Sequence, residues 1–237
     1  MTHALQTTAM PDRLEAERVY LRRYRMEDAV EYRDIAIRNR DHLATFESGN
    51  AAFGIRTVRD SEEVLASIEK RWSERRAYFL GVFRRSDDAF VGQLYIGVAD
   101  PGLPSFSVGY FADCEQEGHG YISEALRTVL ACLFGTLGAH RVSLGCSDRN
   151  TRSAQVAERC GFVREGHLRE DRRWSDGTYS GSYCYGMLAD EFARLSSQRE
   201  DREAAPGAAA GADTPGEPAF GVVPGPATSD RKQPGPP

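Results

Sequence analysis

The chain has 237 residues, a formal net charge of −5 and 41% hydrophobic residues. This length allows one large domain or two small ones, and the negative charge argues against a general nucleic-acid-binding protein, which would carry a strongly basic face. The five cysteines are widely spaced and form no Cys-x-x-Cys pair, which argues against a zinc site or a disulfide framework and is typical of a reducing cytoplasm.

Composition separates one folded part from a tail. Eight of the 11 prolines lie after residue 205, among repeated Gly and Ala and few large apolar residues. Such a segment cannot bury enough apolar surface to offset the entropy lost on ordering, so residues 197–237 are predicted to be disordered. Residues 14–195 form a segment long enough to bury a single hydrophobic core. The start lacks the features of a signal peptide and no apolar run is long enough to span a membrane, so we expect a cytoplasmic protein without a membrane partner.

The first half of the chain is expected to alternate strands and helices. Alternating apolar and charged residues predict strands, and apolar residues at helical spacing predict helices, one of them capped by Asp60 or Ser61. In chain order the prediction is a flexible lead-in over 1–12, a strand over 19–23, helices over 27–37 and 39–46, a loop over 50–55, a helix from about 60 to 72, and strands over 77–84 and 90–98.

A glycine-containing turn follows the next predicted strand, Phe106 to Phe111. It reads Glu117-Gly118-His119-Gly120-Tyr121-Ile122 and leads into a helix with apolar residues at helical spacing. Glycines let the backbone approach a ligand, and the unpaired N–H groups of a first helical turn attract an anion. The turn therefore fits a phosphate or pyrophosphate, although an ordinary loop has the same pattern.

The C-terminal part adds a strand over 141–146, the segment Asn150-Thr151-Arg152-Ser153, a short helix to Cys160, and Gly161-Phe162-Val163-Arg164-Glu165-Gly166. A loop, a Ser-Asp-Gly turn at 175–177, a last strand over 179–188 and a helical turn over 190–195 complete the prediction. The resulting order is β, α, α, α, β, β, β, α, β, α, β, β, which places one more strand between the short helix and the last strand. This order predicts an α/β domain with one mixed sheet covered by helices.

These motifs, in this order, resemble the GNAT superfamily of acetyl-CoA-dependent N-acetyltransferases. More narrowly, they are similar to the ribosomal-protein N-terminal acetyltransferases of the RimJ/RimL type, as are Leu14 to Arg22 and Asn39 to Glu47. The resemblance covers residues 14–195. It implies a GNAT-type single mixed, largely antiparallel sheet flanked by helices, with acetyl-CoA as acetyl donor and no metal.

The resemblance also assigns an acetyl-CoA site. It places the pyrophosphate on the backbone of Glu117, Gly118, His119, Gly120, Tyr121 and Ile122, and the pantetheine arm beside Phe111, Ala112, Asn150 and Ser153. Glu117 stands where the family has Gln or Arg, and Ile122 where it has Gly or Ala. A carboxylate at 117 should repel a diphosphate, or it could cap the helix as an acid near the positive dipole end. His119 fits a phosphate donor or an exposed turn residue, and Asn150 also fits a helix cap.

The resemblance further implies a catalytic residue. Many GNAT enzymes have a tyrosine four residues before the Gly-Phe pair to protonate the departing thiolate, and this chain has Ala157 there. In the resembling group a serine at the position of Ser153 is proposed for this role; the alternative is a first-turn helix residue without a catalytic part. Glu47 is our candidate for contacting the acceptor amine, with Glu170 and Asp171 as alternatives. Acids at positions such as these three are more often solvated surface residues. His42, His140 and His167 are interpreted as structural.

Two functions remain open at this point. The first is an N-acetyltransferase in which a primary amine attacks the thioester directly, the acceptor being a ribosomal or other protein N-terminus or a small-molecule amine. The second is a non-catalytic CoA-binding or regulatory module, suggested by Glu117 and the lack of an evident general base. A Rossmann or P-loop site is disfavoured because the third glycine and a Gly-Lys-Ser/Thr motif are missing. The oligomeric state is not predicted.

Overall fold

One mixed sheet organises the part of the chain that the computed structural model describes, residues 9–46, 50–100, 102–174 and 176–204. Its strands lie in the order β1-β2-β3-β4-β5-β6-β8-β7. All neighbours are antiparallel except β5 and β6, which are parallel. The strand bounds are Arg13–Glu15, Val19–Arg23, Ala77–Arg84, Phe90–Asp100, Ser105–Ala112, Arg141–Ser147, Val163–Arg173 and Tyr179–Leu188 for β1 to β8. The predicted mixed, largely antiparallel sheet is confirmed.

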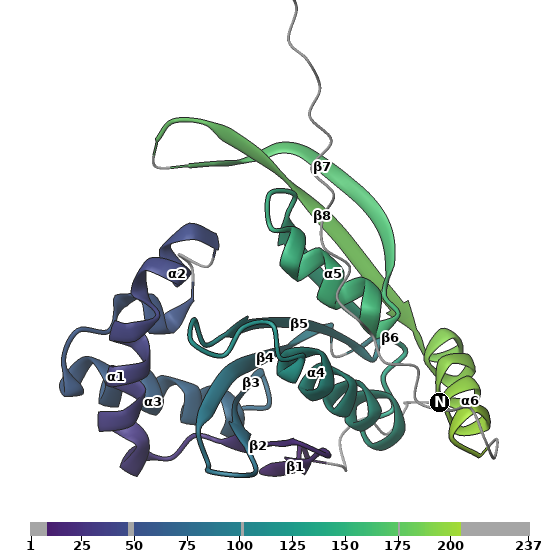
Figure 1. Cartoon of the computed structure of the whole chain (residues 1–237), viewed down its shortest axis with the longest axis horizontal. Coiled ribbons are helices and arrows are strands. Elements are labelled where there is room, and N and C mark those ends of the chain that lie inside the picture. The colour runs from purple at the N-terminus through teal and green to yellow at the C-terminus, as the bar shows by residue number, and fades with distance from the viewer. Residues whose placement is uncertain (1–8, 47–49, 101, 175, 205–237) are drawn as a thin grey trace, which may run out of the picture.

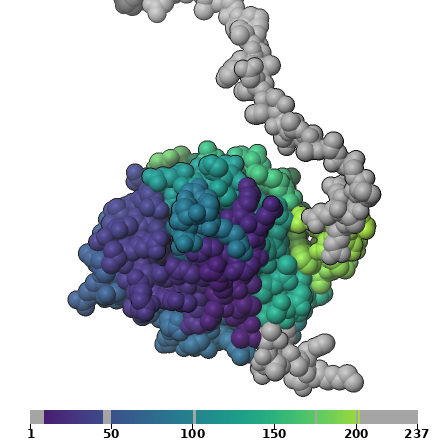
Figure 2. Space-filling view, turned by 60° about the horizontal axis from the view of Figure 1, so that its bottom comes forward, coloured from purple at the N-terminus to yellow at the C-terminus, as the bar shows by residue number. Residues whose placement is uncertain are grey.

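Helices cover this sheet, and Figure 1 shows the N-terminal helices grouped at one end and α6 at the other. Their bounds are Ala29–Arg38, Arg40–Phe46, Val58–Ser73, Tyr121–Ala131, Thr151–Cys160 and Ala189–Ala204 for α1 to α6, with short 3-10 turns at Met26–Asp28 and Ala51–Gly54 and a π turn at Cys132–Thr136. Figure 2 shows the same separation in a second view, with the first helices (purple to blue) and α6 (yellow-green) on opposite sides.

Two hydrophobic clusters lie against the sheet, because the central strands are buried on both faces. In β3, Leu80 and Val82 belong to the cluster that includes α4 and α5, whereas Phe79 and Phe83 belong to the cluster that includes α1 and α3. This alternation follows from the two-residue repeat of a strand. Central strands with apolar residues on both faces can therefore hold the N-terminal helices and α4 in fixed positions about the sheet.

The structure corrects the prediction at helix α3 and at strand β1. Helix α3 begins at Val58 because Thr57, not Asp60 or Ser61, is its N-cap. Thr57 Oγ1 accepts a hydrogen bond from the N–H of Asp60 at 3.1 Å, and the carboxylate of Asp60 accepts one from the N–H of Thr57 at 2.8 Å. This reciprocal pair is a capping box, in which the acid occupies the third helical position. In addition β1, which was not predicted as a separate strand, pairs with β2.

The ends of the domain also extend beyond the prediction. Met10 was expected in a flexible lead-in, but its side chain is only 3% exposed and contacts Cys132. Helix α6 continues to Ala204, through the first residues of the predicted tail, because the residues after Ser197 are mostly good helix formers. Residues 1–8 and 205–237, and with them most of the predicted tail, lie outside the described residues. In the described part, no helix combines the length and apolarity needed to cross a membrane.

Candidate active site

The turn between β5 and α4 presents backbone groups rather than side chains. Gly118 and Gly120 both have positive φ angles, 81° and 77°, which residues with a Cβ rarely adopt. Gly120 immediately precedes α4, and no side chain of the described residues caps this helix. The N–H groups of the first turn are therefore oriented toward the turn, where an anion can accept from them. The predicted glycine turn into a helix is confirmed, and the phosphate assigned to it stays a prediction.

Two polar anchors hold this turn. On one side, Arg18 donates from Nε to Glu124 Oε2 at 2.7 Å and from Nη1 to the carbonyl oxygen of His119 at 3.1 Å. On the other, the buried carboxylate of Asp113, at the end of β5, accepts from Asn39 Nδ2 at 3.0 Å. Asn39 lies between α1 and α2, so the segment that leads into the turn is fixed to the N-terminal helices.

The turn residues themselves differ in exposure. His119 is exposed, and its ring stacks on that of Tyr121 with centroids 5.5 Å apart. Ile122 is buried and lies over Gly92 of β4, where a Cβ would come within 2.4 Å of Ile122 Cδ1. The absence of a side chain at Gly92 therefore makes room for the larger residue at position 122, which explains this departure from the family pattern.

A cleft opens where β5 separates from β6. The two strands pair only as far as Val108 and Leu144, whereas β5 continues beside β4 to Ala112 and β6 continues beside β8 to Ser147. Figure 1 shows α5 between the separating parts of the sheet. The cleft has a volume of about 160 Å³ and is lined by His42, Tyr110, Phe111, Ala112, Glu117, Ile122, Asn150, Arg152, Ser153 and Val156. Six of the predicted cofactor residues thus meet in this cleft, namely Phe111, Ala112, Glu117, Ile122, Asn150 and Ser153. The other four, Gly118, His119, Gly120 and Tyr121, do not line it.

Glu117 does not act as a helix cap. Its carboxylate forms an ion pair with Nη1 of Arg152, in the first turn of α5, and its Oε1 lies 3.7 Å from Nε2 of His42 on α2. The Glu117 side chain is 27% exposed and that of Arg152 76%. The acid that the sequence places beside a phosphate site is therefore partly compensated by an arginine from another element.

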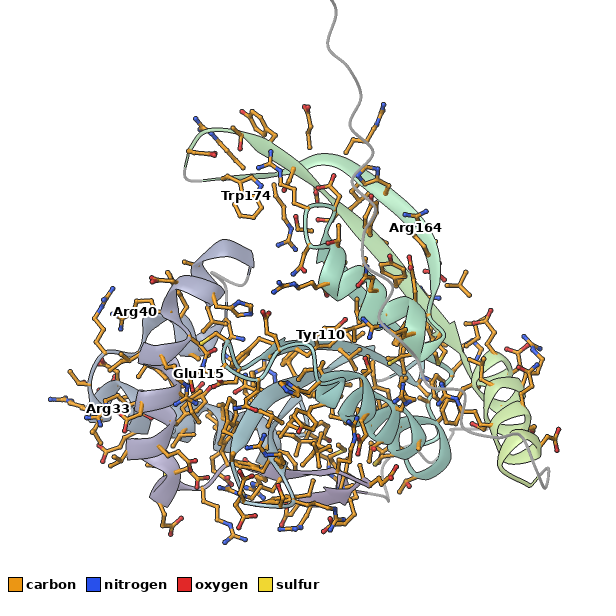
Figure 3. All side chains as sticks on the ribbon, viewed as in Figure 1. Arg33, Arg40, Tyr110, Glu115, Arg164 and Trp174 are labelled. Carbon is orange, nitrogen blue, oxygen red and sulfur yellow. The ribbon has the colours of Figure 1, made fainter. Side chains whose placement is uncertain are left out.

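Ser153 lies at the start of α5 and is held by two neighbours. The side chain of Asn150 is the helix N-cap and accepts from the N–H of Ser153 at 3.0 Å, so the predicted cap is confirmed. Tyr110 of β5 donates its hydroxyl to the carbonyl oxygen of Ser153 at 3.0 Å, and Ser153 Oγ donates back to the Tyr110 hydroxyl at 3.2 Å. Figure 3 shows Tyr110 near the middle of the molecule, beside β5. A tyrosine hydroxyl thus reaches Ser153 from the sheet, although α5 itself carries Ala157.

A second tyrosine fixes α5 to β8. Tyr185 is 1% exposed, and its hydroxyl donates to Glu158 Oε1 at 3.1 Å. Burial first, and then the hydrogen bond to this carboxylate, raise the pKa of Tyr185 to about 12. The phenol therefore stays neutral and a donor at physiological pH, which keeps the helix that carries Ser153 in place.

The structure differs from the sequence interpretation on the acceptor side. Glu170 and Asp171 were expected in a loop, but both are exposed residues of β7, at an irregularity in its pairing with β8. Glu170 has a φ of 51° there. Glu47 lies outside the described residues. His42 was interpreted as structural, yet it lines the cleft.

The remaining features of the cleft had no local signal in the sequence. Tyr110 is 43 residues from Ser153, and Arg152 is 35 residues from Glu117. Only the folded sheet and α5 bring these pairs into contact. In the described residues, no three His, Cys, Asp or Glu side chains gather as a metal site.

Comparisons with known proteins agree with this geometry. A family model described as "Acetyltransferase (GNAT) domain" matches residues 18–163. The "Probable N-acetyltransferase YjcK" of Bacillus subtilis is 30% identical over 168 residues, which cover 69% of this chain and 92% of that protein. The "[Ribosomal protein uS5]-alanine N-acetyltransferase" of Escherichia coli is 26% identical over 177 residues, covering 69% of this chain and 87% of that protein.

A solved structure, "Mycobacterium smegmatis RimJ in complex with CoA-disulfide", matches 80% of this chain and 95% of its own with a TM-score of 0.69 and 26% identity. This RimJ protein therefore binds a CoA compound.

Proposed function

Because the chain belongs to the GNAT acetyltransferase family, we propose that it transfers the acetyl group of acetyl-CoA to the N-terminal amine of a protein. N-acetyltransferase activity and the acetyl-CoA donor follow from the family and its relatives. The acceptor is the proposal. Its support is the likeness to the uS5-alanine N-acetyltransferase of Escherichia coli and to that organism's "Ribosomal-protein-serine acetyltransferase", which is 28% identical over 104 residues.

One observation carries the proposal on the donor side: the cleft between the separated strands leads to the glycine turn. A pantetheine arm is narrow and carries amides, so it suits the backbone edge of β5 at Phe111 and Ala112. The turn at Gly118 and Gly120 offers N–H groups to the diphosphate at the other end. The residues present therefore fit acetyl-CoA, which when bound supplies the activated acetyl group.

Ser153 is the proposed donor to the sulfur that leaves during the reaction. It lines the cleft, and Asn150 and Tyr110 hold its backbone. Its single hydroxyl proton is donated to Tyr110 in this structure, so the hydroxyl rotates from Tyr110 to the sulfur as the thiolate develops. A hydroxyl is a weak acid, so its contribution is a hydrogen bond to the developing thiolate rather than a full proton transfer. Tyr110 is a positioning residue in this scheme, because it acts on the leaving group only through Ser153.

The non-catalytic alternative loses one of its two reasons. It was based partly on an unbalanced carboxylate at position 117, and Glu117 is paired with Arg152. Its other reason was the lack of an evident base. His42 lines the cleft, but it lies 3.7 Å from Glu117, at the end proposed for the diphosphate, so no base for the acceptor amine is identified among the described residues.

The test is acetylation of a peptide panel with free N-termini, followed by mass spectrometry and by release of the CoA thiol. Peptides with N-terminal Ala, Ser or Thr should gain one acetyl group, while the same peptides with a blocked N-terminus serve as controls. Small amines, including a polyamine and an aminoglycoside, complete the panel. Turnover only on small amines would refute the protein acceptor. Thermal protection by CoA without turnover on any amine would support the binding module instead.

A further inference from the structure

Beyond the cleft residues expected from the family, one side chain is placed to contact the phosphates of the donor. Arg152 is the second residue of α5 and lines the cleft opposite the glycine turn. Its guanidinium contacts the carboxylate of Glu117, the first residue of that turn motif. A positive charge therefore lies at the start of the segment whose backbone is proposed to hold the diphosphate.

Arg18 and Arg152, which both contact residues of the turn motif, differ in freedom. Arg18 is engaged by two groups, since it donates to Glu124, whose side chain is 12% exposed, and to the carbonyl oxygen of His119. Arg152 is 76% exposed and, among the described residues, its guanidinium contacts one carboxylate, that of Glu117. A surface ion pair of this kind contributes little free energy. Arg18 is thus a fixed support of the turn, whereas Arg152 can change partner at small cost.

Glu117 retains a second polar neighbour when Arg152 leaves it. Its second oxygen, Oε1, lies 3.7 Å from Nε2 of His42, so the carboxylate keeps a polar neighbour on α2 when the guanidinium turns away. An arginine presents several donors in a planar fork that matches phosphate oxygens, and two charged groups form stronger hydrogen bonds than neutral ones. A diphosphate on the turn is a better partner for Arg152 than the carboxylate of Glu117.

We propose that Arg152 is a further acetyl-CoA-binding residue, held by Glu117 before the donor enters and transferred to the diphosphate when it binds. This inference rests on the proposed placement of acetyl-CoA in the cleft. It explains how a chain with Glu at a position where the family has Gln or Arg keeps a cation at the phosphate site: the positive charge comes from α5 instead of from the turn.

The experiment is a calorimetric titration of Arg152→Gln with three probes: CoA, dephospho-CoA and pantetheine. CoA and dephospho-CoA should bind about fivefold to tenfold more weakly, equal to about 1 to 1.4 kcal/mol. Pantetheine, which lacks phosphates, should bind as it does to the wild type. Arg159→Gln is the matched control, because Arg159 is also exposed on α5 but does not line the cleft. The loss should shrink as salt concentration rises.

The Glu117→Gln variant distinguishes two roles of Arg152: contacting the diphosphate after leaving Glu117, or only neutralising the charge of Glu117. If Arg152 contacts the diphosphate, Arg152→Gln weakens CoA binding even when residue 117 is already Gln. If Arg152 merely offsets the charge of Glu117, the double variant binds CoA as tightly as Glu117→Gln alone, and the proposal is wrong. A loss seen with CoA but not with dephospho-CoA would also overturn it, because Arg152 would then contact the 3′-phosphate.

The proposal and the function on which it rests fail in different ways. If the wild type binds CoA and acetylates peptides while Arg152→Gln keeps full affinity, only the role of Arg152 is refuted. If the wild type binds none of the three probes, the placement of the donor in this cleft is refuted. Melting temperatures of all variants should stay close to that of the wild type, since both side chains lie at the surface of the cleft.

Discussion

Replacing Ser153 with Ala tests the proposed chemistry most directly. The substitution removes one hydroxyl, which donates to Tyr110 at 3.2 Å. The Tyr110 hydroxyl keeps its bond to the carbonyl oxygen at position 153, and Asn150 keeps its cap, since both contact the backbone. The lost neutral hydrogen bond is worth about 0.5 to 1.5 kcal/mol, and Ala is the better helix former. We therefore expect nearly unchanged stability.

The effect on activity should be larger, because the hydroxyl is proposed to donate to a charged sulfur. Hydrogen bonds to charged groups contribute about 1.5 to 3 kcal/mol, which corresponds to a roughly tenfold to 150-fold lower kcat for Ser153→Ala. The affinity for acetyl-CoA should change little, because the charge develops only as the reaction proceeds. Ser153→Thr keeps a hydroxyl and should retain more activity than the Ala variant.

The assay follows CoA thiol release at saturating acetyl-CoA, with a single-turnover measurement to confirm that chemistry limits the rate. Under that condition an unchanged kcat in Ser153→Ala would remove the hydroxyl from the mechanism. A parallel loss in the melting temperature and in kcat would indicate instead that Ser153 supports α5 and does not act on the leaving group.

Three further predictions concern stability and reactivity. Gly161→Ala should lower the melting temperature by about 2 to 8 °C, because a φ of 95° costs a residue with a Cβ about 1 to 2 kcal/mol. The added Cβ would also lie 2.4 Å from Leu195 Cδ1. An unchanged calorimetric melting curve would contradict this prediction. A chain ending at Ala204 should keep the melting temperature and activity of the full chain, because the composition of 205–237 offers no apolar pattern; loss of either would show that these residues dock. In native protein at pH 8, alkylation should modify exposed Cys114 well before Cys160, whose burial raises the pKa of its thiol to about 11; peptide mass spectrometry would reveal equal rates if this is wrong.

Local patterns were sufficient for much of the fold. Strands β3 and β8 begin and end at the predicted residues, because both are rich in apolar or aromatic side chains. The short strand β1 has only three residues and owes its strand conformation to pairing with β2. The predicted order of elements includes strand β7, but its bounds could not be predicted. It is exposed along almost its whole length, so its charged residues show no alternation, and pairing with β8 determines its structure.

The features of the candidate site also fall into those that local sequence predicts and those that depend on the fold. The glycine turn and the cap at Asn150 depend on residues adjacent in the chain, and the sequence predicted both. The contacts of Tyr110 with Ser153 and of Arg152 with Glu117 depend on where the sheet separates and how α5 packs. No local pattern encodes that geometry, so His42 was interpreted as structural and the partner of Glu117 was not foreseen.

The early end of the β5–β6 pairing also bears on solubility. Beyond Val108, the edge of β5 that faces away from β4 is not paired with β6, and such edges at the rim of a sheet invite a strand from another molecule. Here the open edge lies inside the domain, with α5 and the turn at Glu117 lining the same cleft. Covering an edge with a helix or loop is one way in which proteins keep it from pairing with another chain. The protein can thus expose strand backbone to its substrate without offering a template for aggregation.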